Sequence, residues 1–203
     1  FASQMGQLLK RAGLPVELPA NNNPRNPVPV HRDNAFNQPT DVAWDSKGNS
    51  YFSDGYINSR VAKVNARGEW IASWGSLGNG PGQFDTPHGI AVSPADEIYV
   101  ADRGNRRIQV FTPEGKYIRE FTIDVPVDTT KGKITYGVEL PNAKTGSQAP
   151  GAPDALCMTP GPNPVLFSPA ATSVSSAGST PSRARRKTRS GWASSSTGAC
   201  RSW

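Results

Sequence analysis

Residues 36–124 contain the same pattern twice, and this internal repeat limits the possible folds more than any other feature of the sequence. The first part of the pattern recurs at an offset of 48 residues and the second part at 47, so the first copy holds one extra residue. The matching pairs are Pro39-Thr-Asp-Val-Ala-Trp-Asp45 with Pro87-His-Gly-Ile-Ala-Val-Ser93, Asn49-Ser-Tyr-Phe-Ser-Asp54 with Glu97-Ile-Tyr-Val-Ala-Asp102, and Arg60-Val61 with Arg107-Ile108. A repeat of this length with four short apolar runs is typical of a β-propeller blade.

Each copy predicts four antiparallel strands. In the first copy the apolar runs are 41–44, 50–53, 60–64 and 70–74, which are too short for helices and in part alternate like half-buried strands. The links between them contain Gly, Asp and Asn, the residues that tight turns require. A propeller closes its ring with about four to eight blades. Two full copies therefore predict an all-β chain that forms an incomplete propeller.

The rest of the chain is predicted to be parts of flanking blades and their connections. Residues 1–9 resemble 111–118, and Pro153-Asp-Ala-Leu-Cys-Met158 fits the blade openings at Pro39 and Pro87. The predicted division is 1–12 as the end of a truncated blade, 13–35 as a connecting loop, 36–78 and 79–124 as complete blades, 125–150 as a linker, 151–167 as the start of a further blade, and 168–203 as a tail.

The tail differs from the body in composition and charge. It is rich in Ser, Ala and Arg, contains six of the 22 basic residues and none of the 16 acidic ones, so the body is neutral. The basic run 183–189 fits either a nucleic-acid or localisation patch or a solvated, disordered tail. Because the blade pattern stops in mid-strand, a shifted reading frame is a further hypothesis. No apolar stretch approaches the roughly 18 residues that a membrane span needs.

Three residues stand out because the repeat does not require them. His88 follows Pro87 at the start of a strand, where the first copy has Thr40. An imidazole there would point toward the propeller axis and serve as a ligand of Zn²⁺, or it would cap a turn.

Tyr56 lies in the loop between the second and third strands, after a tight Asp-Gly turn. The phenol would act as a base near a bound cation, or it would pack between blades.

Arg103 lies in the matching loop of the second copy and replaces Gly55. Arg103 could have a functional role, in which it binds a carboxylate or stabilises an oxyanion. Alternatively, it has a purely structural role. Its neighbour Arg107 belongs to the repeat and is expected to bond Asp102, as Arg60 bonds Asp54.

The repeat resembles the NHL family of propellers, and its additional residues resemble the peptidyl-α-hydroxyglycine α-amidating lyases within it. The segments that carry this resemblance are Gln38-Pro-Thr-Asp-Val42, Ser53-Asp-Gly-Tyr-Ile-Asn-Ser-Arg-Val61, Gly82-Gln-Phe-Asp-Thr-Pro-His88 and Val100-Ala-Asp-Arg-Gly-Asn-Arg-Arg-Ile-Gln109.

The resemblance implies a six-bladed propeller that holds catalytic Zn²⁺ on three histidines and a structural Ca²⁺ nearby. The reaction it implies releases a peptide amide and glyoxylate from a peptide that ends in α-hydroxyglycine, in a secretory or extracytoplasmic setting. His88 would be one zinc ligand, Tyr56 the catalytic base, and Arg103 the partner of Tyr56 and of the developing charge.

The chain also departs from that pattern. It has a single Pro-His pair, and one imidazole does not hold catalytic zinc, so we expect the 203-residue chain itself to be inactive. The alternative hypothesis is a non-catalytic NHL module that binds protein. The neutral body argues against nucleic acid as a partner, because an RNA-binding face should be basic.

Overall fold

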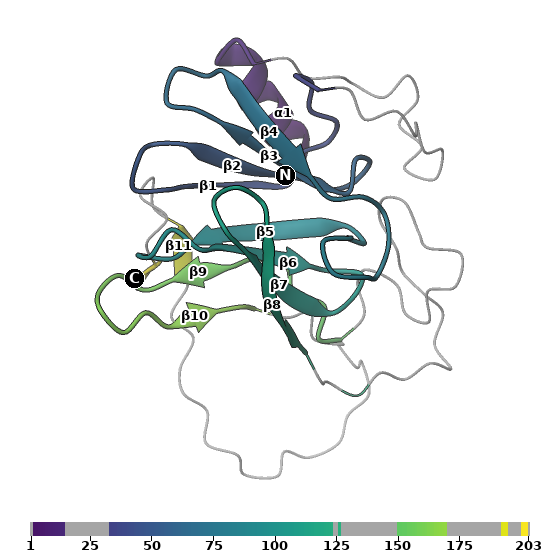
Figure 1. Ribbon diagram of the computed structural model, residues 1–203, viewed down its shortest axis with the longest axis vertical. Helices are drawn as coiled ribbons and strands as arrows, with labels where there is room; N and C mark the ends of the chain where they lie inside the picture. Colours follow the sequence, from purple (N-terminus) through teal and green to yellow (C-terminus); the bar gives the residue numbers. More distant parts are fainter. Residues whose placement is uncertain are drawn as a thin grey trace, which may run out of the picture.

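Two four-stranded antiparallel sheets form the centre of the computed structural model, which describes residues 2–14, 33–123, 126, 150–169, 192–194 and 200–202 (Figure 1). The first sheet has the order β1-β2-β3-β4 and the second β5-β6-β7-β8. Their strands are β1 (Asp41–Trp44), β2 (Ser50–Asp54), β3 (Arg60–Val64), β4 (Trp70–Trp74), β5 (Pro87–Val92), β6 (Ile98–Asp102), β7 (Arg107–Phe111) and β8 (Tyr117–Thr122). Each sheet is one blade, which confirms the predicted all-β, incomplete propeller with two complete blades.

The sequence repeat is also a repeat of backbone conformation. Gln38 and Thr86, which precede the first strand of each blade, have φ of 59° and 57°. Ser59 and Arg106, which precede the third strand, have φ of 49° and 54°. These left-handed positions are uncommon for residues other than glycine, so their recurrence at the same offsets shows that the two copies turn the chain in the same way.

The two blades pack face to face through one apolar cluster. Alternate side chains of a strand point to opposite faces, and accordingly Tyr51 contributes to the cluster between the blades while Phe52 faces the other way. The cluster between the blades consists of Ala43, Tyr51, Val61, Phe84, Ile90, Ile98, Val100 and Phe111, with Trp74, Val92 and Tyr117 packed against it. This shared core fixes the spacing between the first strands β1 and β5.

The prediction of a truncated blade strand at 1–12 is wrong, because the structure has the helix α1 (Ala2–Arg11) there. The segment contains no β-branched residue and is rich in Ala, Gln, Met and Leu, which favour helix. Gly13, at φ 75°, ends the helix: its N–H donates to Lys10 O and that of Leu14 to Leu9 O. Leu9 then packs in an apolar cluster on the outer face of the first blade.

A third segment covers the other face of the second blade. It contains the short antiparallel pair β9 (Cys157–Met158) and β10 (Leu166–Phe167), which agrees with the predicted start of a further blade. Leu156 and Met158 pack with Ala91, Ala101 and Ile108 of the second blade. The order along the stack is therefore α1, first blade, second blade, third segment (Figure 1).

Most of the remaining predictions fall outside the described residues. These include most of the loop 13–35, most of the linker 125–150, and the basic run 183–189. Within 192–202 the structure describes one antiparallel pair, β11 (Trp192–Ser194) with β12 (Cys200–Ser202). In the part of the chain that the structure describes, no helix is long and apolar enough to span a bilayer.

Candidate functional site

The predicted site residues come from one end of the two blades. Thr40 precedes β1, His88 is the second residue of β5, and Asp154 precedes β9, so all three follow a proline at the mouth of a blade. Tyr56 lies in the loop between β2 and β3, and Arg103 in the loop between β6 and β7. The first strands of successive blades lie side by side, β1 against β5 and β5 against β9. The starts of these first strands, which we call the blade mouths, therefore lie next to one another.

The structure places Tyr56 and His88 in direct contact. The phenol oxygen of Tyr56 lies 3.3 Å from His88 Nε2, and the two rings meet edge to face with centroids 5.8 Å apart. The phenol thus reaches from the first blade to the second. Tyr56 is half-buried, and its contact with the second blade fits both a phenol of the site and an aromatic side chain that packs between blades.

The other imidazole nitrogen of His88 meets the third segment. Nδ1 lies 2.5 Å from the backbone carbonyl oxygen of Asp154. A carbonyl only accepts hydrogen bonds, so Nδ1 carries the proton and Nε2 presents its lone pair to Tyr56. His88 therefore contacts the third segment through Nδ1, while its Nε2 presents a lone pair that can accept a proton from Tyr56 or bind a metal.

Arg103 joins the site through Asp154 rather than by touching Tyr56. Its Nε lies 3.3 Å from the Asp154 carboxylate, which is also 3.6 Å from His88 Nδ1. The Arg103 side chain is only 4% exposed, whereas that of Asp154 is 51% exposed. Asp154 is not among the site residues predicted from the sequence. A signal was present, however, because Pro153-Asp154 occupies the same repeat position as Pro87-His88.

The first blade holds the backbone around His88. Thr40 Oγ1 lies 2.8 Å from Ser53 Oγ and 3.0 Å from the carbonyl of Pro87, and Ser53 Oγ donates to the carbonyl of His88 at 2.6 Å. Gly55 permits this approach, since a Cβ there would lie 1.8 Å from the Pro87 oxygen. The position of the imidazole is thus determined by contacts from the neighbouring blade as well as from its own strand.

The surroundings of His88 favour the neutral imidazole. Burial lowers the pKa of His88, and the positive charge of Arg103 lowers it further, while the Asp154 carboxylate and carbonyl act in the opposite direction. The net result is a pKa below the ordinary value. A neutral ring near pH 7 leaves the Nε2 lone pair available.

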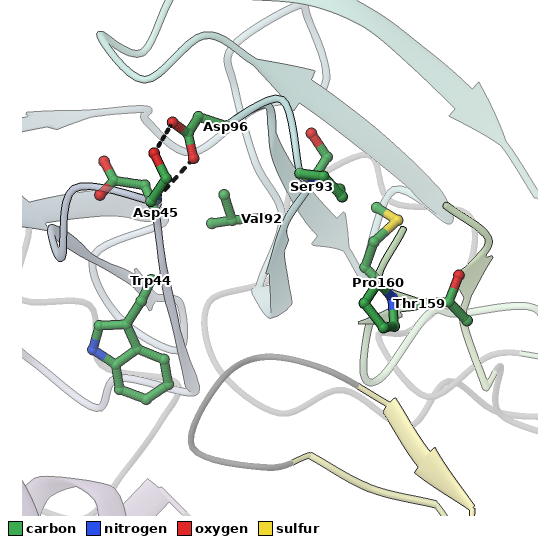
Figure 2. Close-up of a pocket in the computed structure, with 10 residues that line it drawn as sticks. Trp44, Asp45, Val92, Ser93, Asp96, Thr159 and Pro160 are labelled. Atoms are coloured by element: carbon green, nitrogen blue, oxygen red, sulfur yellow. Dashed lines mark hydrogen bonds between the residues drawn. The ribbon is translucent and has the colours of Figure 1, made fainter. Parts of the chain in front are cut away.

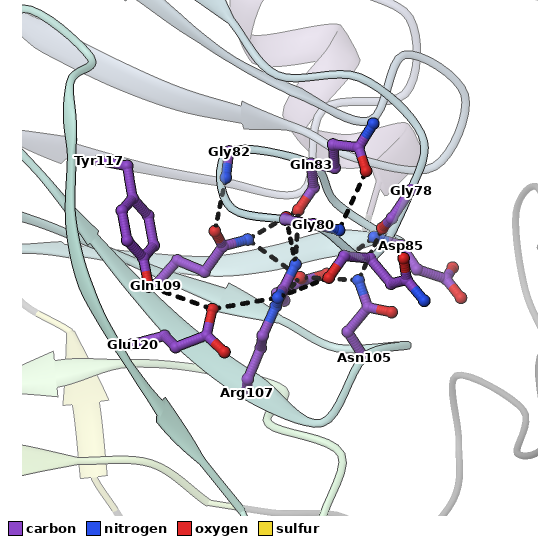
Figure 3. Close-up of polar contacts among 12 residues, drawn as sticks. Gly78, Gly80, Gly82, Gln83, Asp85, Asn105, Arg107, Gln109, Tyr117 and Glu120 are labelled. Carbon is purple, nitrogen blue, oxygen red and sulfur yellow. Dashed lines mark hydrogen bonds and ion pairs between the residues drawn. The ribbon is translucent and has the colours of Figure 1, made fainter.

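The Asp-Arg pairs predicted from the repeat are present and form the scaffold behind the site. Asp102 accepts from Arg107 Nε at 2.7 Å, and Asp54 from Arg60 Nε at 3.1 Å. Arg107 also donates to the backbone carbonyls of the loop before β5, at Asn79, Gly80 and Gln83 (Figure 3). This buried network fixes the loop that leads to Pro87 and His88.

The described residues do not by themselves fit a zinc centre. No group of three His, Cys, Asp or Glu side chains able to hold a metal occurs among residues 2–14, 33–123 and 150–169. His88 Nε2 has the chemistry of a single zinc ligand, with its Nδ1–H fixed by a carbonyl as metal-bound histidines usually have it. The same residues contain no such group for Ca²⁺.

A separate cavity of about 250 Å³ lies at the opposite ends of the first strands (Figure 2). It is lined by Trp44, Val92 and Met158 and by the turns that contain Ser46 and Asp96. The Asp96 carboxylate already accepts from the N–H and hydroxyl of Ser46. This cavity contains none of the predicted site residues.

One family model matches most of the second blade. Residues 84–111, which include Phe84, His88, Arg103 and the whole of β5 to β7, match the family model described as NHL repeat. The chain carries an NHL repeat.

The chain is similar to several proteins whose names describe amidating enzymes. It is 43% identical over 103 residues to the peptidylglycine alpha-amidating monooxygenase of Rattus norvegicus, covering 47% of the chain and 11% of that protein. It is 36% identical over 88 residues to a probable peptidyl-alpha-hydroxyglycine alpha-amidating lyase of Caenorhabditis elegans, covering 42% and 25%. It is also 32% identical over 113 residues to the human NHL repeat-containing protein 3, covering 54% and 29%.

Among solved structures, the virginiamycin B lyase of Staphylococcus aureus is 19% identical, with a TM-score of 0.38 over 66% of this chain and 34% of that one. The chain spans about a tenth of the length of the rat relative and about a quarter of that of the nematode relative.

Proposed function

We propose that this chain is part of an NHL propeller that cleaves peptidyl-α-hydroxyglycine to a peptide amide and glyoxylate. The observation that carries the proposal is the convergence of Tyr56, His88 and Arg103, three residues that the repeat does not require. Tyr56 and His88 are in contact at 3.3 Å, and Asp154 lies beside both His88 and Arg103. Similarity to proteins named as amidating lyases supports the same function.

The side chains can divide the proton transfers of this reaction. The hydroxyl proton of the substrate leaves, a carbonyl forms at that carbon, the carbon–nitrogen bond breaks, and the amide nitrogen gains a proton. Tyr56 would accept the hydroxyl proton while its own proton moves to His88 Nε2, a role that the contact between the two side chains and the proton on Nδ1 support. The reverse transfer then returns a proton to the departing amide. Arg103 supplies positive charge near the developing oxyanion.

We also propose the two metal ions that the family resemblance implies. His88 would be one ligand of Zn²⁺, with further ligands from outside the described residues, and a structural Ca²⁺ is proposed on the same resemblance. The Nε2 lone pair serves either the Tyr56 proton or a metal ion at one time, so the two roles of His88 are alternatives.

Glyoxylate release from a peptide that ends in α-hydroxyglycine tests the proposal. We expect the 203-residue chain to be inactive and a longer product of the same gene, expressed with Zn²⁺, to release glyoxylate. Tyr56→Phe should reduce the rate of that longer product by about 10²- to 10⁴-fold if the phenol is the base. A metal-free, inert longer product would instead favour the non-catalytic, protein-binding NHL module.

A further inference from the structure

We propose that Asp154 is a positioning residue of the candidate site, which fixes the proton of His88 on Nδ1 with its backbone carbonyl and holds Arg103 with its carboxylate. The proposal rests on the lyase function for its catalytic consequence, whereas its two contacts can be tested without any reaction. Asp154 lies at the mouth of the third segment, beside β5, where it meets residues of the second blade.

The carbonyl of Asp154 determines which nitrogen of the His88 imidazole carries the hydrogen. Its oxygen lies 2.5 Å from His88 Nδ1 and accepts that nitrogen's hydrogen. The opposite nitrogen, 3.3 Å from the Tyr56 phenol, is left as an acceptor. If His88 carried its proton on Nε2, the ring would present a donor to the phenol and would neither accept its proton nor bind a metal there. The carbonyl therefore decides whether Tyr56 meets an acceptor.

The carboxylate of Asp154 balances a buried cation. Arg103 is 3% exposed, and its Nε is enclosed without a hydrogen-bond partner in the structure. A buried charge is costly unless an opposite charge lies nearby. The Asp154 carboxylate lies 3.3 Å from Arg103 Nε and is half-exposed, so it offsets the charge from the solvent side of the guanidinium. We therefore assign to it the orientation of Arg103.

Packing of the third segment against the second blade keeps Asp154 close to His88. Leu156 and Met158 are buried against the second blade. Gly89 makes this approach possible, because a Cβ at Gly89 would lie 2.7 Å from the backbone of Ala155 and Leu156. The residue after His88 therefore sets how closely the third segment can come. A substitution at Gly89 can therefore displace the Asp154 carbonyl without changing Asp154 itself.

Nitrogen-15 NMR of the 203-residue chain tests both contacts. The chain has two histidines, so His31→Gln leaves only the signals of His88. We expect the Nδ1–H tautomer above the titration range of the imidazole. Gly89→Ala should push the carbonyl away and produce a mixture of tautomers. An Nε2–H tautomer in the parent chain, or an unchanged Nδ1–H tautomer in a folded Gly89→Ala variant, would refute the role of the carbonyl.

Exchange of the Arg103 Nε hydrogen with water tests the carboxylate. Asp154→Asn keeps the shape of the side chain and the backbone carbonyl but removes the charge, and we expect the hydrogen to exchange faster. Asp96→Asn is the matched control, because it makes the same change at the cavity on the opposite strand ends (Figure 2). Equal exchange rates in the two variants would overturn the role of the carboxylate.

A catalytic readout separates this proposal from the lyase function. If the longer gene product releases glyoxylate, Asp154→Asn should lower kcat roughly 10- to 100-fold with little change in KM, as expected when a reacting group is displaced. An unchanged kcat would show that the positioning has no catalytic consequence. If the longer product is inert while both NMR results hold, the lyase function fails and the structural role of Asp154 stands.

Discussion

Replacing Arg107 with Met should remove the interaction that holds the loop before β5. The guanidinium donates to Asp102, to Glu120 and to three backbone carbonyls. Figure 3 shows Arg107 beside Glu120, Gly80 and Gln83. Asp102 is fully buried and also accepts from Asn105, from Gln109 and from the N–H of Asp85. Arg107→Met would leave the Asp102 charge in the core without its counter-ion.

The expected loss of stability follows from this burial. Breaking a buried ion pair by removing one partner costs about 3–5 kcal/mol, because the remaining charge is uncompensated. For a chain of this size each kcal/mol lowers Tm by about 2–4 °C, so the expected fall in Tm is roughly 6–20 °C. Arg107→Lys keeps the charge but loses the planar fork, and its loss of stability should be intermediate.

Urea unfolding followed by tryptophan fluorescence measures these differences. Glu120→Gln is the control, because Glu120 is 31% exposed and its pairing with Arg107 should be worth about 1 kcal/mol or less. The double variant Asp102→Asn with Arg107→Met should lose less than the sum of the two single losses, by about 0.5–3 kcal/mol. A loss below about 1 kcal/mol for Arg107→Met would refute the argument that this pair anchors the loop.

Three further predictions concern the site. Gly55→Ala should destabilise the chain by several kcal/mol, more than the range of about 1–3 that is usual for overpacking, because its Cβ would overlap the Pro87 oxygen; urea unfolding measures this. Thr40→Val should cost about 1–3 kcal/mol in the same assay, since it removes the hydroxyl that bonds the Pro87 carbonyl. An NMR titration should give His88 a pKa below its ordinary 6.5, so stability is full above pH 6.5 and falls as the pH drops below it, and Arg103→Gln should raise that pKa.

Each of these predictions has a distinct control. Gly80→Ala, where the new Cβ would meet only the end of the Gln83 side chain, should be tolerated far better than Gly55→Ala. Thr40→Ser keeps the hydroxyl and should retain most of the stability that Thr40→Val loses. A His88 pKa at or above 6.5, or no response to Arg103→Gln, would contradict the electrostatic account of the imidazole.

The two complete blades could be predicted from the sequence because the same pattern of strand and turn residues occurs in both copies of the repeat. Apolar runs, turn residues and the Asp-Arg pairs all agree, and the strands begin and end close to the predicted residues. The N-terminal segment was mispredicted because a single likeness to residues 111–118 outweighed its composition. Without a second copy to check the pattern, helix propensity and the Gly13 cap were the better guides.

Prediction of the site residues was likewise limited to the parts of the chain where the repeat pattern is complete. Tyr56, His88 and Arg103 could be found because they differ from the scaffold pattern in complete blades, where the expected residue is known. Asp154 meets His88 through its backbone carbonyl, which every residue has, so its type alone does not indicate that contact. Its repeat position places it at the mouth of a blade, but only the packing at Gly89 brings that mouth within reach.

The contacts of the His88 imidazole depend on the spacing between the blades. One nitrogen faces a phenol from the preceding blade and the other a carbonyl from the following segment, so a single rigid ring bridges three successive units of the fold. Any tilt or separation of these units must lengthen at least one of the two contacts. A molecule that entered between Tyr56 and His88 would therefore have to separate the first blade from the second at this contact.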